Sequence, residues 1–352
     1  EINVLLASDT GGEHVETRGS ISIFRDYTRS ALALLGLSAT LLCGAAIANP
    51  VDRSERAEQD WVVPPQVSKK TEVIRAVEIG DPIIEVASAA ALGRTLGEAE
   101  CDLKSIRRGS ARVPRFFVES LPADFDKRMA VDKRKRMFIR TVLPLILKAN
   151  EEVLAERRRL VSIEEQLSSS HYIHPIDLFW LEQLAEKYRV SPDDFATLLR
   201  RVDAVSPTVA LAQSIEESGW GRSRFARLGN ALFGQRVWSE SGGFVPEERA
   251  EGETFAVRAF DSLLDSVRGY VLNLNRHYAY ADFRHMRAQM RANATELDGG
   301  RLSETLVNYS ERRWGYVEAI RKLIASNRLE QFENARLATE PVAMDDTLVA
   351  SR

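Results

Sequence analysis

The chain has 352 residues, of which 44% are hydrophobic and 28% charged; this balance suits a globular protein of one or two domains and excludes wholesale disorder. The formal net charge is −3, so there is no overall basic field and no nucleic-acid partner is expected. Two cysteines, Cys43 and Cys101, are too few for a disulfide framework, and no Cys-x-x-Cys pair offers a zinc or redox site. A lone thiol such as Cys101 is more often a small buried apolar residue than a nucleophile.

An uncharged apolar segment, residues 31–48, follows Arg25 and Arg29 near the start of the chain. It ends in Ala46-Ile-Ala48, the small-x-small pattern of a signal-peptidase site, and its length barely suffices to span a bilayer. Residues 1–48 are therefore predicted to be an export signal with an N-terminal extension, and an uncleaved membrane anchor is the alternative. Both place the remaining chain in the periplasm or cell envelope.

The next part of the chain is expected to be a linker and then a helical region. Residues 49–70 are polar and interrupted by prolines, as is typical of a linker, and 71–200 are predicted to form a helical N-terminal region. Between 131 and 167, apolar residues recur at the three-and-four spacing of one helix face. Pro144 is expected to kink or restart this helix, and the serines at 168–170 predict a break after it.

Three helix starts follow, each marked by a proline. Pro175 opens one helix, and Ser191-Pro192 and Ser206-Pro207 each combine a Ser N-cap with Pro at the first helical position. The helix after Ser191 is predicted to run to about Val202. The helix after Ser206 is predicted to run until Gly219 ends it.

Glycines alternate with aromatic and β-branched residues between 229 and 260, a composition typical of a small antiparallel hairpin or lobe. Helical periodicity returns at Ser262, and further helices are predicted near 282–294, 301–309 and 315–328. The final residues, 333–352, are polar and are expected to be loose. The prediction is a mostly helical α+β protein with one small β insertion.

The helix that ends at Gly219 carries Glu217, whose surroundings favour a carboxylic acid with a raised pKa. The negative end of the helix dipole disfavours a carboxylate there, and Trp220, three residues on, is expected to pack against it. Such an acid is what cleavage of a glycosidic bond needs for the leaving oxygen. Glu216 is the competitor, since neighbouring helix positions point about 100° apart. From composition alone, a solvated surface carboxylate is the simpler interpretation of both.

Motifs on both sides of Glu217 point to a known family. They are Ser206-Pro-Thr-Val-Ala-Leu-Ala-Gln213, Glu217-Ser-Gly-Trp-Gly-Arg-Ser-Arg-Phe-Ala226, Gly229-Asn-Ala-Leu-Phe-Gly-Gln235, Asn273-Leu-Asn275 and Asn308-Tyr-Ser-Glu-Arg312. Together with Phe138 to Arg159, they resemble the glucosaminidase domain of glycoside hydrolase family 73, in its Bax-type branch, over about residues 110–330. The pair Glu-Ser-Gly-Trp-Gly and Asn-x-Leu-Phe-Gly is specific. The resemblance implies a lysozyme-like α+β fold for residues 201–332 and peptidoglycan as the substrate.

The resemblance also implies roles for individual residues. The general acid of the family is the Glu of Glu-Ser-Gly-Trp-Gly, which is Glu217 here. Phe233 is expected to stack on or shape the sugar site, with plain core packing as the alternative. The substrate-binding residues are expected to be Trp220, Asn230, Phe233, Gly234 and Tyr316.

The family often carries a second carboxylate in the β-lobe. Glu248 is favoured as a catalytic residue because it lies just before Arg258-Ala-Phe260, where the chain re-enters the helical part. The other candidates are Glu247, Glu251 and Glu253. Attack by the substrate's own acetamido group is the alternative, so inverting, retaining and substrate-assisted routes all stay open.

A tyrosine late in the family's domain faces the site. Tyr309 is the first choice as a catalytic residue and Tyr316 the second, because the usual Asp-Pro is replaced by Arg312-Arg313-Trp314; core packing is the alternative for both tyrosines. His277 and His285 invite a metal interpretation, but no third ligand is spaced to help. Structural histidines are therefore predicted, and neither a metal nor a cofactor is expected.

The sequence thus predicts an exported endo-β-N-acetylglucosaminidase that cuts cell-wall glycan strands at the β-1,4 bond after N-acetylglucosamine. One alternative is a lytic transglycosylase on the same fold, and another is a non-catalytic cell-wall-binding protein. The basic run Arg157-Arg158-Arg159 offers contact with an anionic polymer, although a solvated helix face is the preferred interpretation. No oligomeric state is predicted.

Overall fold

The computed structural model describes residues 81, 83–99, 101–125, 129–170, 172–237, 243–244 and 256–342. The chain divides into two units, Glu1–Val77 and Glu78–Arg352, and all described residues belong to the second. The predicted export segment, the linker, Cys43 and Glu248 with its neighbouring candidates lie outside the described residues. Within the described ranges, no helix is both long enough and apolar enough to cross a membrane.

Short strands and helices precede the first long helix. In chain order they are β1 (Ile83–Ile84), α2 (Ala89–Glu98), α3 (Leu103–Arg107), β2 (Val113–Arg115) and β3 (Phe117–Val118). β1 pairs in parallel with β3, and β2 pairs in parallel with β7 (Leu337–Pro341). The prediction that residues 333–352 are loose was therefore wrong for 337–341. Leu337 is buried opposite Val113, so this apolar contact and the backbone ladder fix a polar segment.

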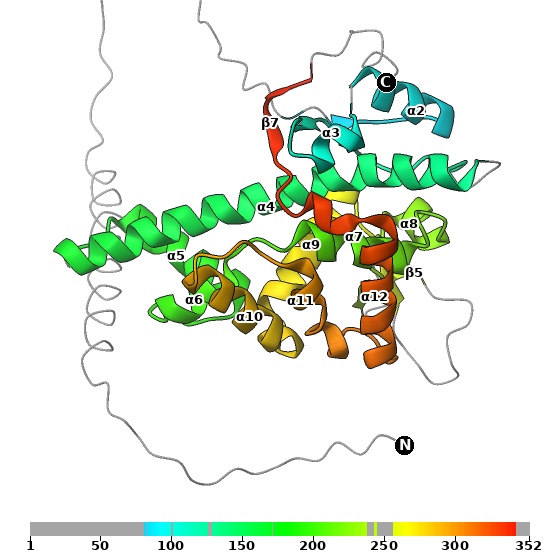
Figure 1. The fold of residues 1–352 in the computed structure, drawn as a ribbon. Coiled ribbons are helices and arrows are strands. Elements are labelled where there is room, and N and C mark those ends of the chain that lie inside the picture. Colours follow the sequence, from blue (N-terminus) through cyan, green and yellow to red (C-terminus); the bar gives the residue numbers. More distant parts are fainter. Residues whose placement is uncertain are drawn as a thin grey trace, which may run out of the picture. The chain divides into compact units, whose positions relative to one another are not determined.

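Helix α4 (Val131–Ser170) runs across the unit, with α2, α3 and β7 above it and the other helices mostly below it (Figure 1). Pro144 lies inside this helix, so the helix does not restart at this position, and the alternative of a kink stays a prediction. Every side chain from Thr141 to Leu147 is buried. Packing on both sides of this stretch holds the backbone helical although proline removes one hydrogen bond. The helix ends at Ser170, so the three serines predicted as a break form its last residues.

The next two helices are α5 (Pro175–Tyr188) and α6 (Phe195–Arg201). α5 begins at the predicted proline, but α6 begins later than Ser191-Pro192 suggested. The N-cap is Asp194, whose carboxylate accepts a hydrogen bond from the backbone N–H of Thr197. Ser191 instead donates its hydroxyl proton to Asp193, so the Ser-Pro pair forms a turn ahead of the helix.

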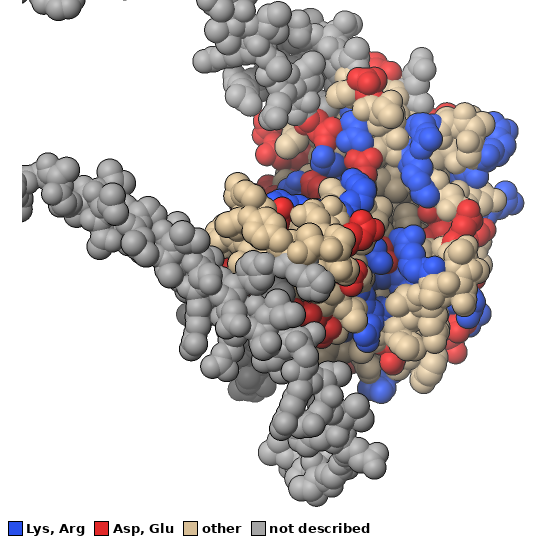
Figure 2. Space-filling view, turned by 90° about the vertical axis from the view of Figure 1, so that its left-hand side faces the viewer, with Lys and Arg blue, Asp and Glu red and all other residues tan. Residues whose placement is uncertain are grey.

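In the basic run on α4, Arg158 is exposed, while Arg157 and Arg159 make contacts with neighbouring helices. The guanidinium of Arg157 donates to the carbonyl oxygens of Leu199 and Val202 at the end of α6, the latter at 2.9 Å. Arg159 pairs with Asp177 at 2.8 Å and lies over the ring of Trp180. Basic and acidic side chains are intermixed on the face that Figure 2 shows.

Helix α7 (Pro207–Ser218) lies at the centre of the fold and carries Glu217. Ser206 caps it, with its hydroxyl accepting from the N–H of Val209 at 3.2 Å, and Gly219 ends it in a left-handed conformation, both as predicted. Every residue from Pro207 to Ile215 is buried, because α7 packs against α4, α11, α12 and η3. Its C-terminal turn is where the chain first leaves the core.

The predicted β-lobe follows α8 (Arg224–Gly229). Its strands are β4 (Arg236–Val237), β5 (Gly243–Phe244) and β6 (Ala256–Arg258), paired antiparallel in the order β4-β6-β5. Because β6 lies in the middle, the chain that leaves α8 and the chain that enters the next helix are adjacent. The lobe therefore begins and ends beside the end of α7. It is the small β insertion that was predicted in a mostly helical α+β fold.

The remaining chain is helical, as predicted from Ser262 onward. The elements are α9 (Leu263–Arg276), η1 (Tyr278–Tyr280), α10 (Ala281–Ala292), α11 (Gly299–Ser303), η2 (Leu306–Asn308), α12 (Trp314–Asn327) and η3 (Leu329–Phe332). The helix predicted near 301–309 is two short pieces, α11 and η2, rather than one.

A buried polar cluster holds the segment that leads into α7. Arg287 is 1% exposed, and its guanidinium donates to the carbonyl oxygens of Arg200, Asp203 and Ala204. Asn150 of α4 exchanges two hydrogen bonds with the backbone of Val205, at 2.7 and 2.9 Å. These contacts satisfy the polar groups of a buried, irregular backbone and fix the point from which α7 starts.

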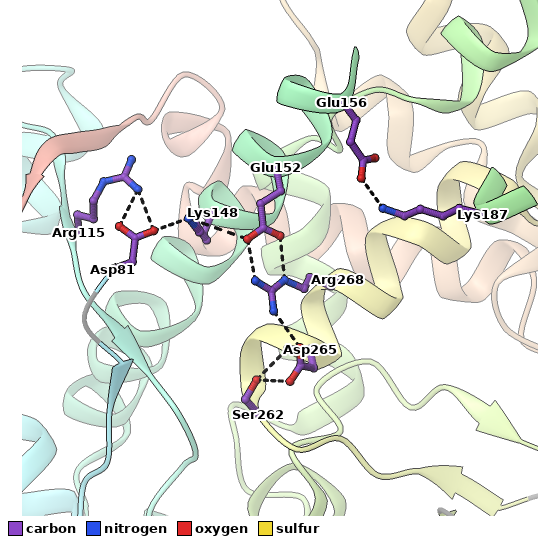
Figure 3. A network of polar contacts seen from close by, with 9 residues as sticks. All are labelled: Asp81, Arg115, Lys148, Glu152, Glu156, Lys187, Ser262, Asp265 and Arg268. Carbon is purple, nitrogen blue, oxygen red and sulfur yellow. Dashed lines mark hydrogen bonds and ion pairs between the residues drawn. The ribbon is translucent and has the colours of Figure 1, made fainter. Parts of the chain in front are cut away.

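Ion pairs join α4 to α5 and α9 on the outer side of the fold (Figure 3). Arg268 of α9 binds both oxygens of Glu152 at 2.7 and 2.8 Å and Asp265 at 3.0 Å. Lys187 of α5 pairs with Glu156 at 2.6 Å. Residues from 78 to 200 and the predicted domain 201–332 therefore form one compact unit, in which α4 supports the helix that carries Glu217.

Helix α11 packs closely against the start of α7 at Gly299. A β-carbon at Gly299 would lie 2.5 Å from Cβ of Thr208 and 2.7 Å from Oγ of Ser206, at the start of α7. Gly299→Ala is therefore expected to cost about 1–3 kcal/mol, because the helices must move apart. Gly315→Ala is the matched control, since that glycine of α12 has open space around it and alanine favours helix by up to about 1 kcal/mol. Chemical denaturation measures both; equal effects would contradict the close contact.

Candidate active site

Glu217 lies in the last turn of α7 and is partly buried. Burial raises the pKa of its carboxyl group from 4.5 to about 7; a hydrogen bond from Tyr316 opposes the shift, and the charge of Glu216 adds to it. A carboxyl group with this pKa is protonated in a large fraction of molecules near neutral pH. Glu217 is therefore able to act as a proton donor.

The hydroxyl of Tyr316 donates to Oε1 of Glu217 at 2.9 Å. Tyr316 stands in the first turn of α12 and is 1% exposed. Its contact with the acid corrects the choice made from the sequence, where Tyr309 was preferred. The hydroxyl of Tyr309 donates instead to the carbonyl oxygen of Phe233 at 3.1 Å, and its ring stacks on Tyr316 with centroids 5.3 Å apart. Tyr309 thus supports Tyr316 rather than meeting the acid.

Two buried residues behind Tyr316 were missed as site residues. Gln213 donates from Nε2 to the hydroxyl oxygen of Tyr316 at 3.0 Å, and Tyr270 donates to Oε1 of Gln213 at 2.6 Å. The available signal was the position of Gln213, four residues before Glu217 and therefore on the same face of the helix. Tyr270 looked like one more apolar-face residue of α9.

Gly234 lies directly beside the acid. Its backbone is left-handed, with φ of +60°, and a β-carbon there would stand 3.3 Å from Oε2 of Glu217. A side chain at this position would therefore be strained and would crowd the second carboxylate oxygen. The predicted place of Gly234 at the site agrees with this geometry, which brings the start of the β-lobe against the end of α7.

Phe233 and Asn230 serve the framework of the site. Phe233 is 2% exposed and stacks on Tyr270 with ring centroids 3.9 Å apart, so its ring is a core group and does not face a sugar. Asn230 ends α8 in a left-handed conformation, and its amide donates to the carbonyl oxygens of Phe260 and Asp261, both at 3.1 Å. Asn230 thereby ties the two ends of the lobe together.

Trp220 does not pack on Glu217 as expected. Its backbone is left-handed, with φ of +62°, and this turn carries the indole onto α4. There the ring meets Phe138 edge to face at 6.0 Å, with the ammonium of Lys135 4.8 Å from its centroid. Tyr316 and Gly234, rather than this indole, lie against the carboxyl group of Glu217.

Two described carboxylates near the acid are paired with arginine. Glu216 accepts from Arg312 at 2.5 Å. Of the two neighbouring glutamates, Glu216 is therefore an ion-pair partner, while Glu217 accepts a hydrogen bond from the buried Tyr316. Glu311 is 82% exposed and pairs with Arg236 at 3.1 Å. Glu248, the favoured second carboxylate, lies outside the described residues.

The two histidines have structural contacts. Nδ1 of His277 accepts from the N–H of Ala279 at 3.2 Å and caps η1, and Nε2 of His285 contacts the amide of Gln289 at 3.1 Å. Within the described ranges, no group of three or more His, Cys, Asp or Glu side chains is placed to hold a metal ion. Cys101 is 2% exposed, and burial raises its pKa to about 11, as expected for an unreactive apolar thiol.

Comparison with known proteins gives the family. The family model described as mannosyl-glycoprotein endo-beta-N-acetylglucosaminidase matches residues 193–329. Protein bax of Escherichia coli (strain K12) is 34% identical over 203 residues, which cover 56% of this chain and 70% of that protein. The chain belongs to the glucosaminidase family, in its Bax-type branch.

Among solved structures, the catalytic domain of the autolysin Auto from Listeria monocytogenes is similar to 48% of this Bax-type chain and 94% of its own, with 15% identity and a TM-score of 0.28. A TM-score this low supports no conclusion about fold or function. The family match covers α6 to α12, so the matched domain includes Glu217, Gly234, Tyr309 and Tyr316.

The raised pKa of Glu217 predicts how this Bax-type protein responds to pH. The folded value of about 7 lies above the ordinary 4.5, so folded molecules bind more protons between these values and stability falls as pH rises through this window. Glu217→Gln removes the ionisable group. The melting temperature of this variant, relative to that of the wild type, is expected to rise between pH 5 and pH 8. The rise is equivalent to about 2 kcal/mol of unfolding free energy. Glu330→Gln, at an exposed position, is the control; parallel pH curves for wild type and Glu217→Gln would contradict the raised pKa.

Proposed function

We propose that this protein is a peptidoglycan hydrolase, an endo-β-N-acetylglucosaminidase that cleaves the β-1,4 bond after N-acetylglucosamine in cell-wall glycan strands. The observation that carries the proposal is Glu217, a partly buried carboxyl group with a pKa raised to about 7 and a buried tyrosine on one oxygen, within a glucosaminidase-family domain. Glycosidic bonds resist hydrolysis until the leaving oxygen is protonated, and an acid with this pKa supplies the proton.

In this proposal Glu217 protonates the glycosidic oxygen as the bond to the anomeric carbon breaks. The carboxylate that remains is stabilised by the hydrogen bond from Tyr316 and by the positive charges of Arg312 and Arg236, which lower the pKa of Glu217. The same groups thus assist the proton transfer. The burial that raises the pKa keeps the proton in place until the bond is attacked.

The developing positive charge on the sugar needs a second group. Glu248 is the proposed carboxylate, and the acetamido group of the substrate is the alternative, its carbonyl oxygen attacking the anomeric carbon. The ion pairs of Glu216 and Glu311 support this choice of candidates, because both carboxylates are already engaged with arginine. Residues 31–48 are proposed to direct the chain to the cell envelope, where the substrate lies.

Digestion of isolated cell-wall sacculi tests the reaction. The expected products carry reducing N-acetylglucosamine ends, identified by mass spectrometry. Anhydromuramic ends would instead establish a lytic transglycosylase. Binding to sacculi without cleavage would establish a non-catalytic wall-binding protein.

Substitution of the acid tests its role in the same assay. Glu217→Gln is expected to lower the rate of cleavage by about 100-fold or more, because the amide cannot donate the proton to the leaving oxygen. Glu216→Gln keeps the proton donor and is the matched control at the neighbouring position. Equal losses in the two variants would show that the effect comes from the helix end rather than from the acid.

The rate should also depend on pH. Because the acid works in its protonated form, kcat/KM for wild-type protein is expected to fall as pH rises through about 7. A rate that stays constant between pH 5 and pH 9 would contradict Glu217 as the proton donor.

A further inference from the structure

Four polar side chains form a row of hydrogen bonds that ends at Glu217. Tyr270 of α9 donates to Oε1 of Gln213 at 2.6 Å, and Nε2 of Gln213 donates to the hydroxyl oxygen of Tyr316 at 3.0 Å. Tyr316 of α12 then donates to Oε1 of Glu217 at 2.9 Å. The first three side chains are 0%, 0% and 1% exposed, so solvent does not complete their hydrogen bonds.

The direction of this row is set at Tyr270. A phenol carries one proton, and for the fully buried Tyr270 the acceptor found among the described residues is the amide oxygen of Gln213. A buried hydroxyl that loses its acceptor costs about 1–3 kcal/mol. Tyr270 therefore keeps the oxygen of the Gln213 amide turned toward α9.

The amide orientation decides what Tyr316 does. With its oxygen held by Tyr270, Gln213 presents its NH₂ group to Tyr316, and an NH₂ group only donates. The hydroxyl oxygen of Tyr316 must then accept, and its own proton must point to Oε1 of Glu217. The reverse order, with Glu217 donating to Tyr316 and Tyr316 donating to Gln213, would leave the proton of Tyr270 facing the NH₂ group.

We propose that Gln213, oriented by Tyr270, is a positioning residue that keeps the transferable proton of Glu217 on Oε2. Oε1 accepts from Tyr316, and in a neutral carboxyl group the carbonyl oxygen is a stronger acceptor than the O–H oxygen, so this hydrogen bond favours the proton on Oε2. Among the described residues none hydrogen-bonds to Oε2, the oxygen that faces Gly234, where a β-carbon would stand 3.3 Å away. The proposal deepens the proposed function, because this proton is the one that the glycosidic oxygen would receive.

Other charged and titratable groups surround the acid and set its pKa without choosing between its oxygens. From α7 and the neighbouring elements they are Glu216, Arg236, Tyr280, Tyr309 and Arg312. They remain unchanged when Gln213 is replaced, and a comparison of Gln213 variants therefore isolates the amide.

The test measures the pKa of Glu217 by ¹³C NMR titration of glutamate side chains, with Glu217→Gln to assign the signal. Gln213→Leu and Tyr270→Phe are each expected to raise this pKa, because either change permits the neutral acid to place its proton on Oε1 as well. The double variant is expected to match Gln213→Leu, since Tyr270 acts through the amide. The control is Tyr188→Phe, which removes the hydrogen bond from a buried tyrosine of α5 to Glu156 of α4 and should leave the pKa of Glu217 unchanged.

Two results would overturn the proposal: additive shifts in the double variant, or no shift in Tyr270→Phe. Thermal unfolding of each variant, compared with that of Tyr188→Phe, shows whether the variant is folded. Tyr270→Phe removes one hydroxyl only, so it still tests the proposal if Gln213→Leu does not fold. This titration does not require catalysis. If sacculi are not cleaved but the single and double variants shift the pKa of Glu217 as expected, the proposed function fails and the positioning role stands.

Cleavage of sacculi gives a second readout. In the single variants kcat is expected to fall about tenfold with little change in KM, and lowering the pH should not restore it, because the proton is misplaced even when the acid is neutral. A loss that disappears at low pH would show that the substitutions change only the pKa, and would overturn the positioning role.

Discussion

The burial of α7 on every side is the constraint on which the rest of the structure depends. A helix of the sequence Pro-Thr-Val-Ala-Leu-Ala-Gln-Ser-Ile, surrounded by α4, α11, α12 and η3, has no solvated face along its first nine residues. Its start must be satisfied by buried partners, which Ser206, Asn150 and Arg287 provide. At its end the backbone must turn away from the helix, and Gly219 permits this turn by adopting a left-handed conformation.

This arrangement places a carboxyl group where the core meets the surface. Glu217 is close enough to the core for burial to raise its pKa, and far enough out to remain partly exposed. Tyr316 limits the shift by donating to one oxygen, and Gly234 leaves room at the other. The acid strength of the site therefore follows from where α7 ends rather than from a dense cluster of charges.

The sequence predicted those helix ends and turns that depend on residues close by in the chain. The cap at Ser206, the stop at Gly219 and the glycine-rich lobe were all evident from residue types and spacing, and the motif around Glu217 predicted the residue that is proposed as the acid. The choice between Tyr309 and Tyr316 was not evident, because both occur in one irregular segment and only the start of α12 decides which hydroxyl reaches the acid.

Other errors have the same origin in long-range contacts. Pro144 remained inside α4 because the buried stretch around it packs on both sides, and residues 337–341 became a strand because Val113, more than 200 positions earlier, offered a partner. Trp220 was misplaced by a left-handed backbone that spacing rules do not anticipate. Gln213 was quoted as part of a motif, but its hydrogen bonds required the positions of α9 and α12.

The central claim is that the end of a fully buried helix turns an ordinary glutamate into an acid for neutral pH. The most direct measurement is the midpoint at which the side-chain carboxyl carbon of Glu217 titrates in the folded wild-type protein. The account predicts a midpoint near 7, well above the ordinary 4.5. A midpoint at the ordinary value would contradict it, because burial at the end of α7 would then have no effect on the acid.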